Sequence, residues 1–175
     1  PFTLAVEDSS IAGARGVNVD GTKVTSAMFD GNVWTTDGSA VGVDDSVTAG
    51  AVTFQNNDVT GVGFYTLSGG HTVTGNSFDV VANEYGIRIF ESGGGTFTNN
   101  TFTGDGTGIL LRGFLGGGFD TNDVSGNTLT ENAFGDPDDI GANFGANTID
   151  GVSYDTGAIG TSAGETIAGT GGANY

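Results

Sequence analysis

The chain lacks cysteine altogether, and histidine and methionine occur once each. Without thiols it contains neither a disulfide bond nor a thiolate-bound metal. Basic residues are also scarce, because 4 Lys and Arg stand against 21 Asp and Glu, which gives a net charge of -17. A field of this sign repels nucleic acids and anionic membranes. We therefore expect neither of these as a partner.

Long apolar runs and proline are missing as well. No stretch approaches the ~18 apolar residues of a membrane-spanning helix, so we expect no membrane span. Only 2 residues are proline, whereas 34 are glycine. Because this glycine follows no Gly-X-Y period, the chain is not collagen-like. The first residues show no basic segment of a signal peptide and no initiator methionine, so we expect a mature piece of a longer protein.

What the chain does contain is a repeat. Its template is an apolar residue, any residue, Gly, Asn or Ala, then Asn, any residue and a second apolar residue. Five segments fit it, at residues 54–59, 73–78, 97–102, 124–129 and 144–149. A sixth segment, at residues 24–29, keeps the frame but has Ala27 in the place of Asn. A unit that recurs about every 20 to 30 residues indicates stacked structural repeats.

A second motif, Gly-Val/Ile-x-apolar, recurs between these segments, as at residues 16–19, 86–89 and 108–111. Apolar and polar residues alternate within both motifs, which is typical of half-buried strands, and turn-forming residues separate them. Only Leu4 to Ile11 shows a modest helical pattern. Two or three short strands in each repeat suit one turn of a solenoid. We predict an all-β, right-handed parallel β-helix of about six coils.

The whole chain, residues 1–175, is expected to form a single domain. Residues 1–15 would be an N-terminal cap, with Leu4 to Ile11 as a short helix, residues 16–150 the coils, and residues 151–175 a C-terminal cap or tail. Within the coils the repeated asparagines would stack, each amide bonding to the coils above and below. This structural ladder comprises Asn57, Asn76, Asn100, Asn127 and Asn147.

The repeats resemble those of right-handed parallel β-helix proteins of the pectate-lyase-like superfamily, including its NosD-type and carbohydrate-associated groups. The residues that carry the resemblance include 86–89 (Gly-Ile-Arg-Ile) and 98–102 (Thr-Asn-Asn-Thr-Phe), and it covers about residues 16–150. The superfamily contains polysaccharide lyases, hydrolases and epimerases together with non-catalytic surface modules. The tail at residues 164–174 resembles the lead-in to calcium-binding RTX repeats, although their repeated Asp is missing.

Few residues offer chemistry. For a binding surface we single out Tyr65, Tyr85, Arg88, Glu91 and Arg112, which we expect to line one face. The resemblance implies that, in an enzyme, Arg88 and Arg112 would serve as base or carboxylate partner, and a structural alternative pairs each arginine with nearby acids. His71 is a further candidate base, because its ordinary pKa suits neutral pH.

The acidic loops leave two interpretations open: a solvated surface, or calcium sites, since calcium favours carboxylate and carbonyl oxygens. The metal candidates are Asp136, Asp138 and Asp139, and calcium is the only cofactor we consider.

We expect a non-catalytic structural or binding module of an exported or cell-surface bacterial protein. Its partners would be another copy of itself, stacked end to end or side by side, or a surface polysaccharide. The alternative function is a lyase or epimerase that acts on an acidic glycan. Convergence of Arg88, Arg112 and an acid in one groove would favour that enzyme.

Overall fold

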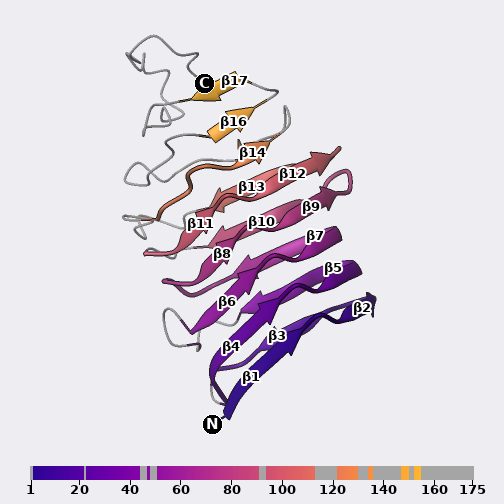
Figure 1. The fold of residues 1–175 in the computed structure, drawn as a ribbon, viewed down its shortest axis with the longest axis vertical. Helices are drawn as coiled ribbons and strands as arrows, with labels where there is room; N and C mark the ends of the chain where they lie inside the picture. Colours follow the sequence, from indigo (N-terminus) through magenta and orange to yellow (C-terminus); the bar gives the residue numbers. More distant parts are fainter. Residues whose placement is uncertain are drawn as a thin grey trace.

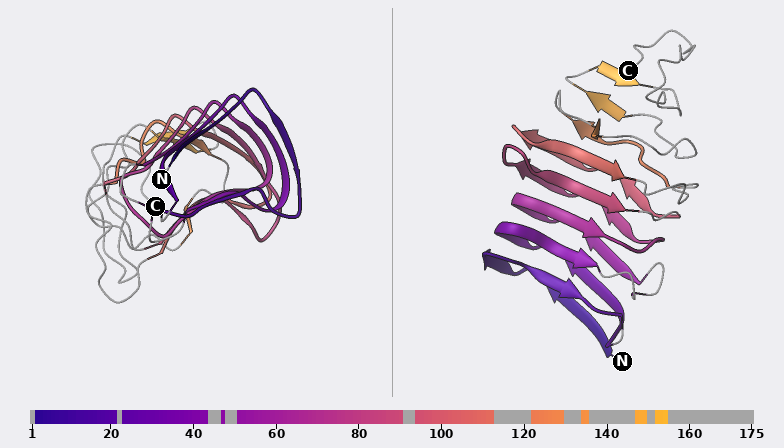
Figure 2. Two further views of the ribbon diagram at one scale, coloured as in Figure 1. Left: turned by 90° about the horizontal axis from the view of Figure 1, so that it is seen from below. Right: turned by 180° about the vertical axis from the view of Figure 1, so that it is seen from behind.

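The computed structural model describes residues 2–21, 23–43, 47, 51–90, 94–112, 122–129, 134–135, 147–149 and 152–154. Within these residues the fold is all-β, and no helix occurs. The strands stack along the long axis of the molecule (Figure 1), and seen along that axis the coils lie over one another (Figure 2). The predicted parallel β-helix is confirmed, with about five turns. Most of the expected sixth coil falls on residues outside those described.

Each coil contributes strands to three faces. The first face is a five-stranded sheet of β1 (Phe2–Glu7), β4 (Val24–Asp30), β6 (Val52–Gln55), β8 (Thr72–Thr74) and β11 (Thr96–Thr98). A 12-stranded sheet provides the other two faces. Every pairing between coils is parallel, and only β16 (Asn147–Ile149) and β17 (Val152–Tyr154) pair antiparallel.

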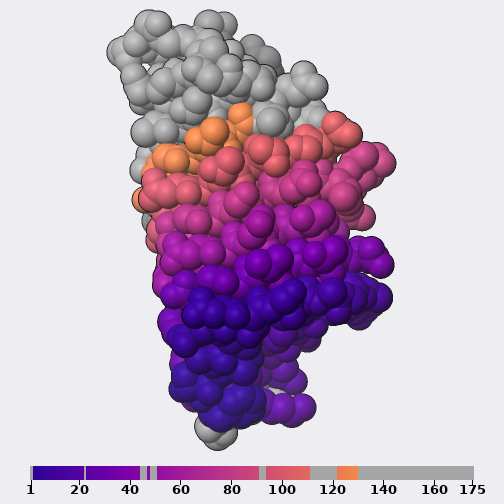
Figure 3. All heavy atoms as spheres, turned by 45° about the vertical axis from the view of Figure 1, so that its right-hand side comes forward, coloured from indigo at the N-terminus to yellow at the C-terminus, as the bar shows by residue number. Residues whose placement is uncertain are grey.

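The 12-stranded sheet divides into two runs of paired strands. The second face contains β2 (Ser10–Gly13), β9 (Ser77–Val80), β12 (Thr101–Gly104), β14 (Thr128–Leu129) and β16, with the first halves of β5 (Val33–Val43) and β7 (Asp58–Thr66). The third face contains β3 (Val17–Val19), β10 (Tyr85–Phe90), β13 (Thr107–Arg112), β15 (Phe134–Gly135) and the second halves of β5 and β7. In the space-filling view the coils form stacked bands (Figure 3).

The interior is filled by columns of apolar side chains, one residue from each coil. Phe29, Phe54, Val73 and Phe97 form one column, in register across the first face. The neighbouring column includes Phe78 and Phe102, whose rings stack with centroids 5.0 Å apart. All are buried, and each fully buried side chain of this size contributes about 1.5–3 kcal/mol relative to exposure.

In the second coil, the repeat begins at a different residue from the one predicted. Its template lies at residues 29–34 (Phe-Asp-Gly-Asn-Val-Trp) and not at 24–29, because Phe29 pairs with Phe54 and Trp34 with Val59. Strands β4 and β6 end in register, with Asp30 paired to Gln55, and the three extra residues of β4 lie at its start. Residues 24–26 therefore belong to the strand that precedes the turn. Asn32, and not Ala27, therefore occupies the asparagine position.

The helix expected at Leu4 to Ile11 is also wrong. Strands β1 and β2 occupy this segment and pair in parallel with β4 and β5. Leu4 and Val6 pack against the core, while Thr3, Ala5 and Glu7, which alternate with them, are exposed. This alternation with period two belongs to a half-buried strand. The extent of the single domain stays a prediction.

The turn between the first and second faces is built around buried asparagines. These are Asn32, Asn57, Asn76, Asn100 and Asn127, one in each successive coil. The side-chain Nδ2 of each of the first four donates to the Oδ1 of the next asparagine in this series, at 2.9–3.1 Å. The same Oδ1 atoms accept the backbone N–H of the preceding asparagine. Because all five side chains are buried, this ladder satisfies polar groups that water does not reach. Asn32 was missed by the sequence analysis, and the side chain of Asn147 is outside the described part.

Candidate binding groove on the third face

Strand register places one outward-facing column on the third face. Asn18 pairs with Gly42, Gly42 with Tyr65, Tyr65 with Arg88, and Arg88 with Leu110. Their neighbours along each strand point inward and belong to the core, as Ile87 and Ile89 do on either side of Arg88. Because side chains alternate across a strand, Tyr65 and Arg88 lie on the outer surface of adjacent coils.

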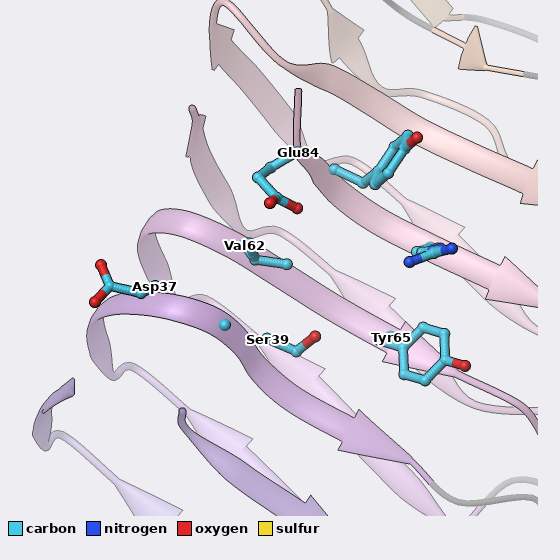
Figure 4. A pocket seen from close by; sticks show the side chains of 8 residues that line it. Asp37, Ser39, Val62, Tyr65 and Glu84 are labelled. Carbon is cyan, nitrogen blue, oxygen red and sulfur yellow. The ribbon is translucent and has the colours of Figure 1, made fainter. Parts of the chain in front are cut away.

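Two adjoining cavities lie over this column. One, of about 250 Å³, is lined by Tyr65, Tyr85 and Arg88 and by the acids Asp37 and Glu84. Figure 4 shows Tyr65 and Asp37 at opposite ends of its labelled residues, with Ser39, Val62 and Glu84 between them. The other, of about 520 Å³, extends over Arg15, Asn18 and Gly42. They share Gly38, Ser39 and Tyr65, and we call the two together the third-face groove.

Small residues create the space in the groove. Gly42 stands in the same column as Asn18 and Tyr65 but carries no side chain, and a Cβ there would lie 3.0 Å from Asn18 Oδ1. A Cβ at Gly38 would lie 2.8 Å from the carbonyl oxygen of Ala14. A tyrosine ring beside a floor of glycine and serine gives a concave surface with one apolar wall.

Arg88 is held by aromatic rings. Its guanidinium carbon lies 4.5 Å from the ring centroid of Phe90, 5.3 Å from that of Tyr85 and 5.6 Å from that of Tyr65. The rings of Tyr65 and Phe90 also meet edge to face, 5.7 Å apart. Cation–π contacts of this kind contribute about 0.5–2 kcal/mol each, more when desolvated. The cluster fixes the position of the cation without using its N–H groups.

No acid pairs with Arg88 among the residues that the structure describes, where the only ion pair joins Lys23 to Asp20 at 3.9 Å. Glu84 lines the same cavity but makes no such pair. In addition, Arg88 Nε is the one buried side-chain nitrogen or oxygen in this part of the chain that has no hydrogen-bond partner. The pairing of Arg88 with a nearby acid, which the sequence left open, is therefore not formed with Glu84.

The structure brings together three of the five residues proposed for binding, Tyr65, Tyr85 and Arg88. Glu91 lies outside the described residues. Arg112 pairs with Phe90, one coil on and two positions along from Arg88, and its side chain is outside the described part. Four further residues of the groove were not singled out from the sequence: Arg15, Asn18, Ser39 and Gly42. Aligning the second motif in its structural register would have placed Asn18 and Gly42 in the column of Arg88.

His71 does not lie on the surface. Its ring is fully buried, with Nδ1 accepting the Val52 N–H at 3.3 Å and Nε2 lying 2.8 Å from Ser68 Oγ. Burial lowers its pKa from 6.5 to about 4, because desolvation disfavours the charged form. The ring is buried and both of its nitrogens are engaged, so this geometry does not favour His71 as a catalytic base, and that role stays a prediction.

The proposed calcium ligands Asp136, Asp138 and Asp139 lie outside the described residues. Within the described ranges, no group of three or more His, Asp or Glu side chains gathers to hold a metal ion, so these ranges do not support calcium. They also contain no helix that is long and apolar enough to cross a membrane.

One protein family matches the chain. A family model described as "Periplasmic copper-binding protein (NosD)" covers residues 4–161. A search of curated proteins and a search of solved structures found no match. The description of the family as periplasmic agrees with the export expected from the sequence.

The donor atoms of this chain do not fit copper. Copper(I) sites are built from thiolate and thioether ligands, and copper(II) sites from imidazole with further nitrogen or oxygen ligands. The whole chain has no Cys, one Met and one His. The His71 ring is enclosed, as shown above, and Met28 lies on β4 beside Ala5 and Thr53. Neither residue joins a set of soft ligands.

The match extends over most of the chain, and the stacked parallel coils and their asparagine ladder account for the repeats on which the resemblance was based. The chain therefore belongs to the NosD family of β-helix proteins.

Proposed function

We propose that this chain is an exported binding module, active outside the cell or on its surface, that holds a glycan in the third-face groove. The observation that carries the proposal is the pair of adjoining cavities that share Gly38, Ser39 and Tyr65. Binding sites for small ligands are concave, have apolar walls and contain a few polar groups. This groove has those properties.

The groove chemistry suits sugar rings. Tyr65 and Tyr85 offer apolar ring faces against which a pyranose packs, and their hydroxyls remain available for hydrogen bonds. Ser39 and Asn18 add neutral donors and acceptors, and Arg15 and Arg88 add charged donors. The groove crosses several coils from Asn18 to Arg88, which suits an extended chain better than a single compact molecule.

Binding without turnover is favoured by the position of the ionisable residues. General acid–base catalysis needs a group within hydrogen-bond reach of the proton that it moves. The sole histidine is enclosed in the core, and Arg88 and Arg112 occupy different positions along their strands. We therefore do not favour the lyase or epimerase alternative. Association of the module with a second copy of itself remains a prediction.

Affinity electrophoresis of the chain through gels that contain single polysaccharides tests the proposal. We expect at least one polysaccharide to retard the wild type, and Tyr65→Ala to weaken the retardation about tenfold, which corresponds to about 1.4 kcal/mol of lost contact. Thr101→Ala, which changes an exposed residue of the second face, is the matched control and should behave as the wild type. Equal retardation of both variants and the wild type would exclude the third-face groove as the binding site.

A further inference from the structure

The edge of the first coil has no partner among the residues that the structure describes. Strand β1 pairs only with β4, and β2 and β3 each pair only with β5. The other edge of each strand carries backbone N–H and C=O groups that no described strand meets. Figure 1 shows these three strands at the N-terminal end of the stack. An open edge of this kind is a template for pairing with another chain.

The apolar columns of the core are also less well covered at this edge. Leu4 and Val6 are only partly buried, whereas Ala27 and Phe29, which pair with them in the next coil, are buried. Phe2, at the start of β1, exposes 55% of its surface. Removing apolar surface from water is favourable in proportion to its area. A partner that covers this end therefore gains apolar contact together with backbone hydrogen bonds.

Strand β1 presents its free backbone groups in a regular array. Its register with β4 is irregular only between Phe2 and Thr3. The N–H groups of Phe2 and Asp8 both donate to the neighbouring coil, and the direction of the backbone groups alternates along a strand. The N–H and C=O groups of Thr3, Ala5 and Glu7 therefore point toward the open edge.

The asparagine ladder ends at the first coil. Ser9 occupies the asparagine position there, and its N–H donates to Asn32 Oδ1 at 3.0 Å. Its hydroxyl donates to the carbonyl oxygen of Glu7 at 2.9 Å. In the coils beyond, each Oδ1 accepts both the N–H and the Nδ2 of the preceding asparagine, as Asn57 does from Asn32. Because Ser9 has no amide with which to continue this ladder, the edge suits an antiparallel partner better than a further parallel coil.

Charges of opposite sign lie at the two ends of β1. Glu7 and Asp8 follow its last turn of chain, whereas Lys23 lies beside its start, where the Lys23 carbonyl oxygen accepts the Phe2 N–H. Residues 2–23 contain two of the 4 bases of the chain but only three of its 21 acids, so the repulsion between two acidic copies is reduced at this end. An antiparallel copy brings the acids of one chain to the base of the other.

We propose that a second copy of this chain binds the open edge of the first coil, end to end across a two-fold axis, through antiparallel β1 strands. With the axis at Ala5, this residue lies opposite itself and Thr3 lies opposite Glu7, so all three free-edge residues exchange backbone hydrogen bonds. Glu7 of one copy then approaches Lys23 of the other. A two-fold contact uses the same surface of both copies and closes on itself, so the product is a dimer. The proposal does not depend on glycan binding.

Sedimentation velocity of the complete chain over a wide range of concentrations tests the proposal. We expect a monomer–dimer equilibrium without larger species. Ala5→Pro should raise the dissociation constant by about tenfold or more, because it removes an edge N–H that the monomer does not use. Ala5→Val keeps that N–H at the same exposed position, so this matched control should dimerise as the wild type does. Circular dichroism should show the same fold in all three proteins.

A charge exchange tests the same contact without altering the backbone. Glu7→Lys and Lys23→Glu, each alone, should weaken the dimer, because like charges then meet across the axis. The double variant should regain most of the lost affinity, since it restores a pair of opposite charges. Because the chain contains no Cys, Ala5→Cys introduces a single thiol, and a short bis-maleimide should link two copies through it. Thr101→Cys, at an exposed position of the second face, should not cross-link.

Three outcomes would overturn the proposal. A monomer at every concentration would leave the edge of the first coil to a different segment or protein. A dimer that Ala5→Pro and both single charge variants leave unchanged would place the interface elsewhere on the chain. Open-ended oligomers would indicate head-to-tail stacking and contradict the two-fold contact.

Discussion

Replacing Asn76 by alanine removes the middle of the asparagine ladder. In the wild type Asn76 Oδ1 accepts from the backbone N–H and from Nδ2 of Asn57, at 2.9 and 3.0 Å. Asn76 Nδ2 donates to the carbonyl oxygens of Phe54 and Thr74 and to Asn100 Oδ1. Five hydrogen bonds of one buried side chain are therefore lost together.

The cost follows from which groups keep another partner. Asn57 Nδ2 retains the carbonyl oxygens of Phe29 and Gln55, and Asn100 Oδ1 retains the backbone N–H of residue 76. The backbone N–H of Asn57 loses the acceptor that the ladder provides. Each hydrogen bond contributes a net value of ~1 kcal/mol, less where the partner keeps another bond and more for the N–H that is left unsatisfied. We therefore expect Asn76→Ala to lower the free energy of unfolding by about 3–5 kcal/mol. That is a large part of the 5–15 kcal/mol typical of a folded domain.

Urea unfolding followed by circular dichroism measures this change as a shift of the midpoint at an unchanged slope. Thr101→Ala, an exposed position of the same coil system, is the control and should stay within about 0.5 kcal/mol of the wild type. A cost below about 1 kcal/mol for Asn76→Ala would show that the ladder is not the stabilising element described here.

Two further predictions concern His71 and copper. Because the pKa of His71 falls to about 4 in the folded chain from 6.5 unfolded, the unfolded state alone takes up a proton between these values. Stability is then fully present above pH 6.5 and decreases by roughly 3 kcal/mol in total as the pH falls to 4. His71→Asn should be less stable than the wild type at pH 7, but its free energy of unfolding should lack the part of the decrease that His71 causes between pH 6.5 and 4.5. Urea unfolding of both proteins at a series of pH values measures this difference. An identical decrease in the two proteins would refute the buried neutral ring. Equimolar copper should leave the melting temperature of the chain unchanged, whereas a ligand that binds the native state would raise it. A rise that a chelator reverses would refute the conclusion that the donor atoms of this chain do not fit copper.

The sequence predicts the architecture because its repeats record the solenoid directly. Asn76 and Asn100 occupy the same position of the repeat, between apolar residues. Because equivalent residues stack in buried columns, few residue types fit these positions, and the repeat is therefore visible in the sequence. Asn32 stands in the same frame at residues 29–34, but the earlier segment at residues 24–29 offered a competing alignment with Ala27 in the asparagine position. The pairing of Phe29 with Phe54 decides between the two alignments, and a template of six residues does not include strand pairing.

The groove was only partly predictable for the same reason. Tyr65 and Arg88 were recognised as unusual residues, but their contact depends on the register that pairs them across two coils. Gly42 leaves space in the column of Tyr65 and Arg88 because it has no side chain. The sequence alone does not show this role, because it does not show which residues share that column. For His71, the sequence shows a titratable ring and does not show on which side of the coil it lies. Its burial, its hydrogen bond from the Val52 N–H and its contact with the Phe64 ring show that it faces inward.

The most direct test of the third-face groove is a map of amide and side-chain chemical shifts in the presence of an oligosaccharide identified by the binding assays. We expect shifts at Ser39, Gly42, Tyr65 and Arg88, with the Thr72 and Thr74 amides of the first face unchanged. Shifts concentrated on the threonines of the first face, with the groove residues unmoved, would contradict it.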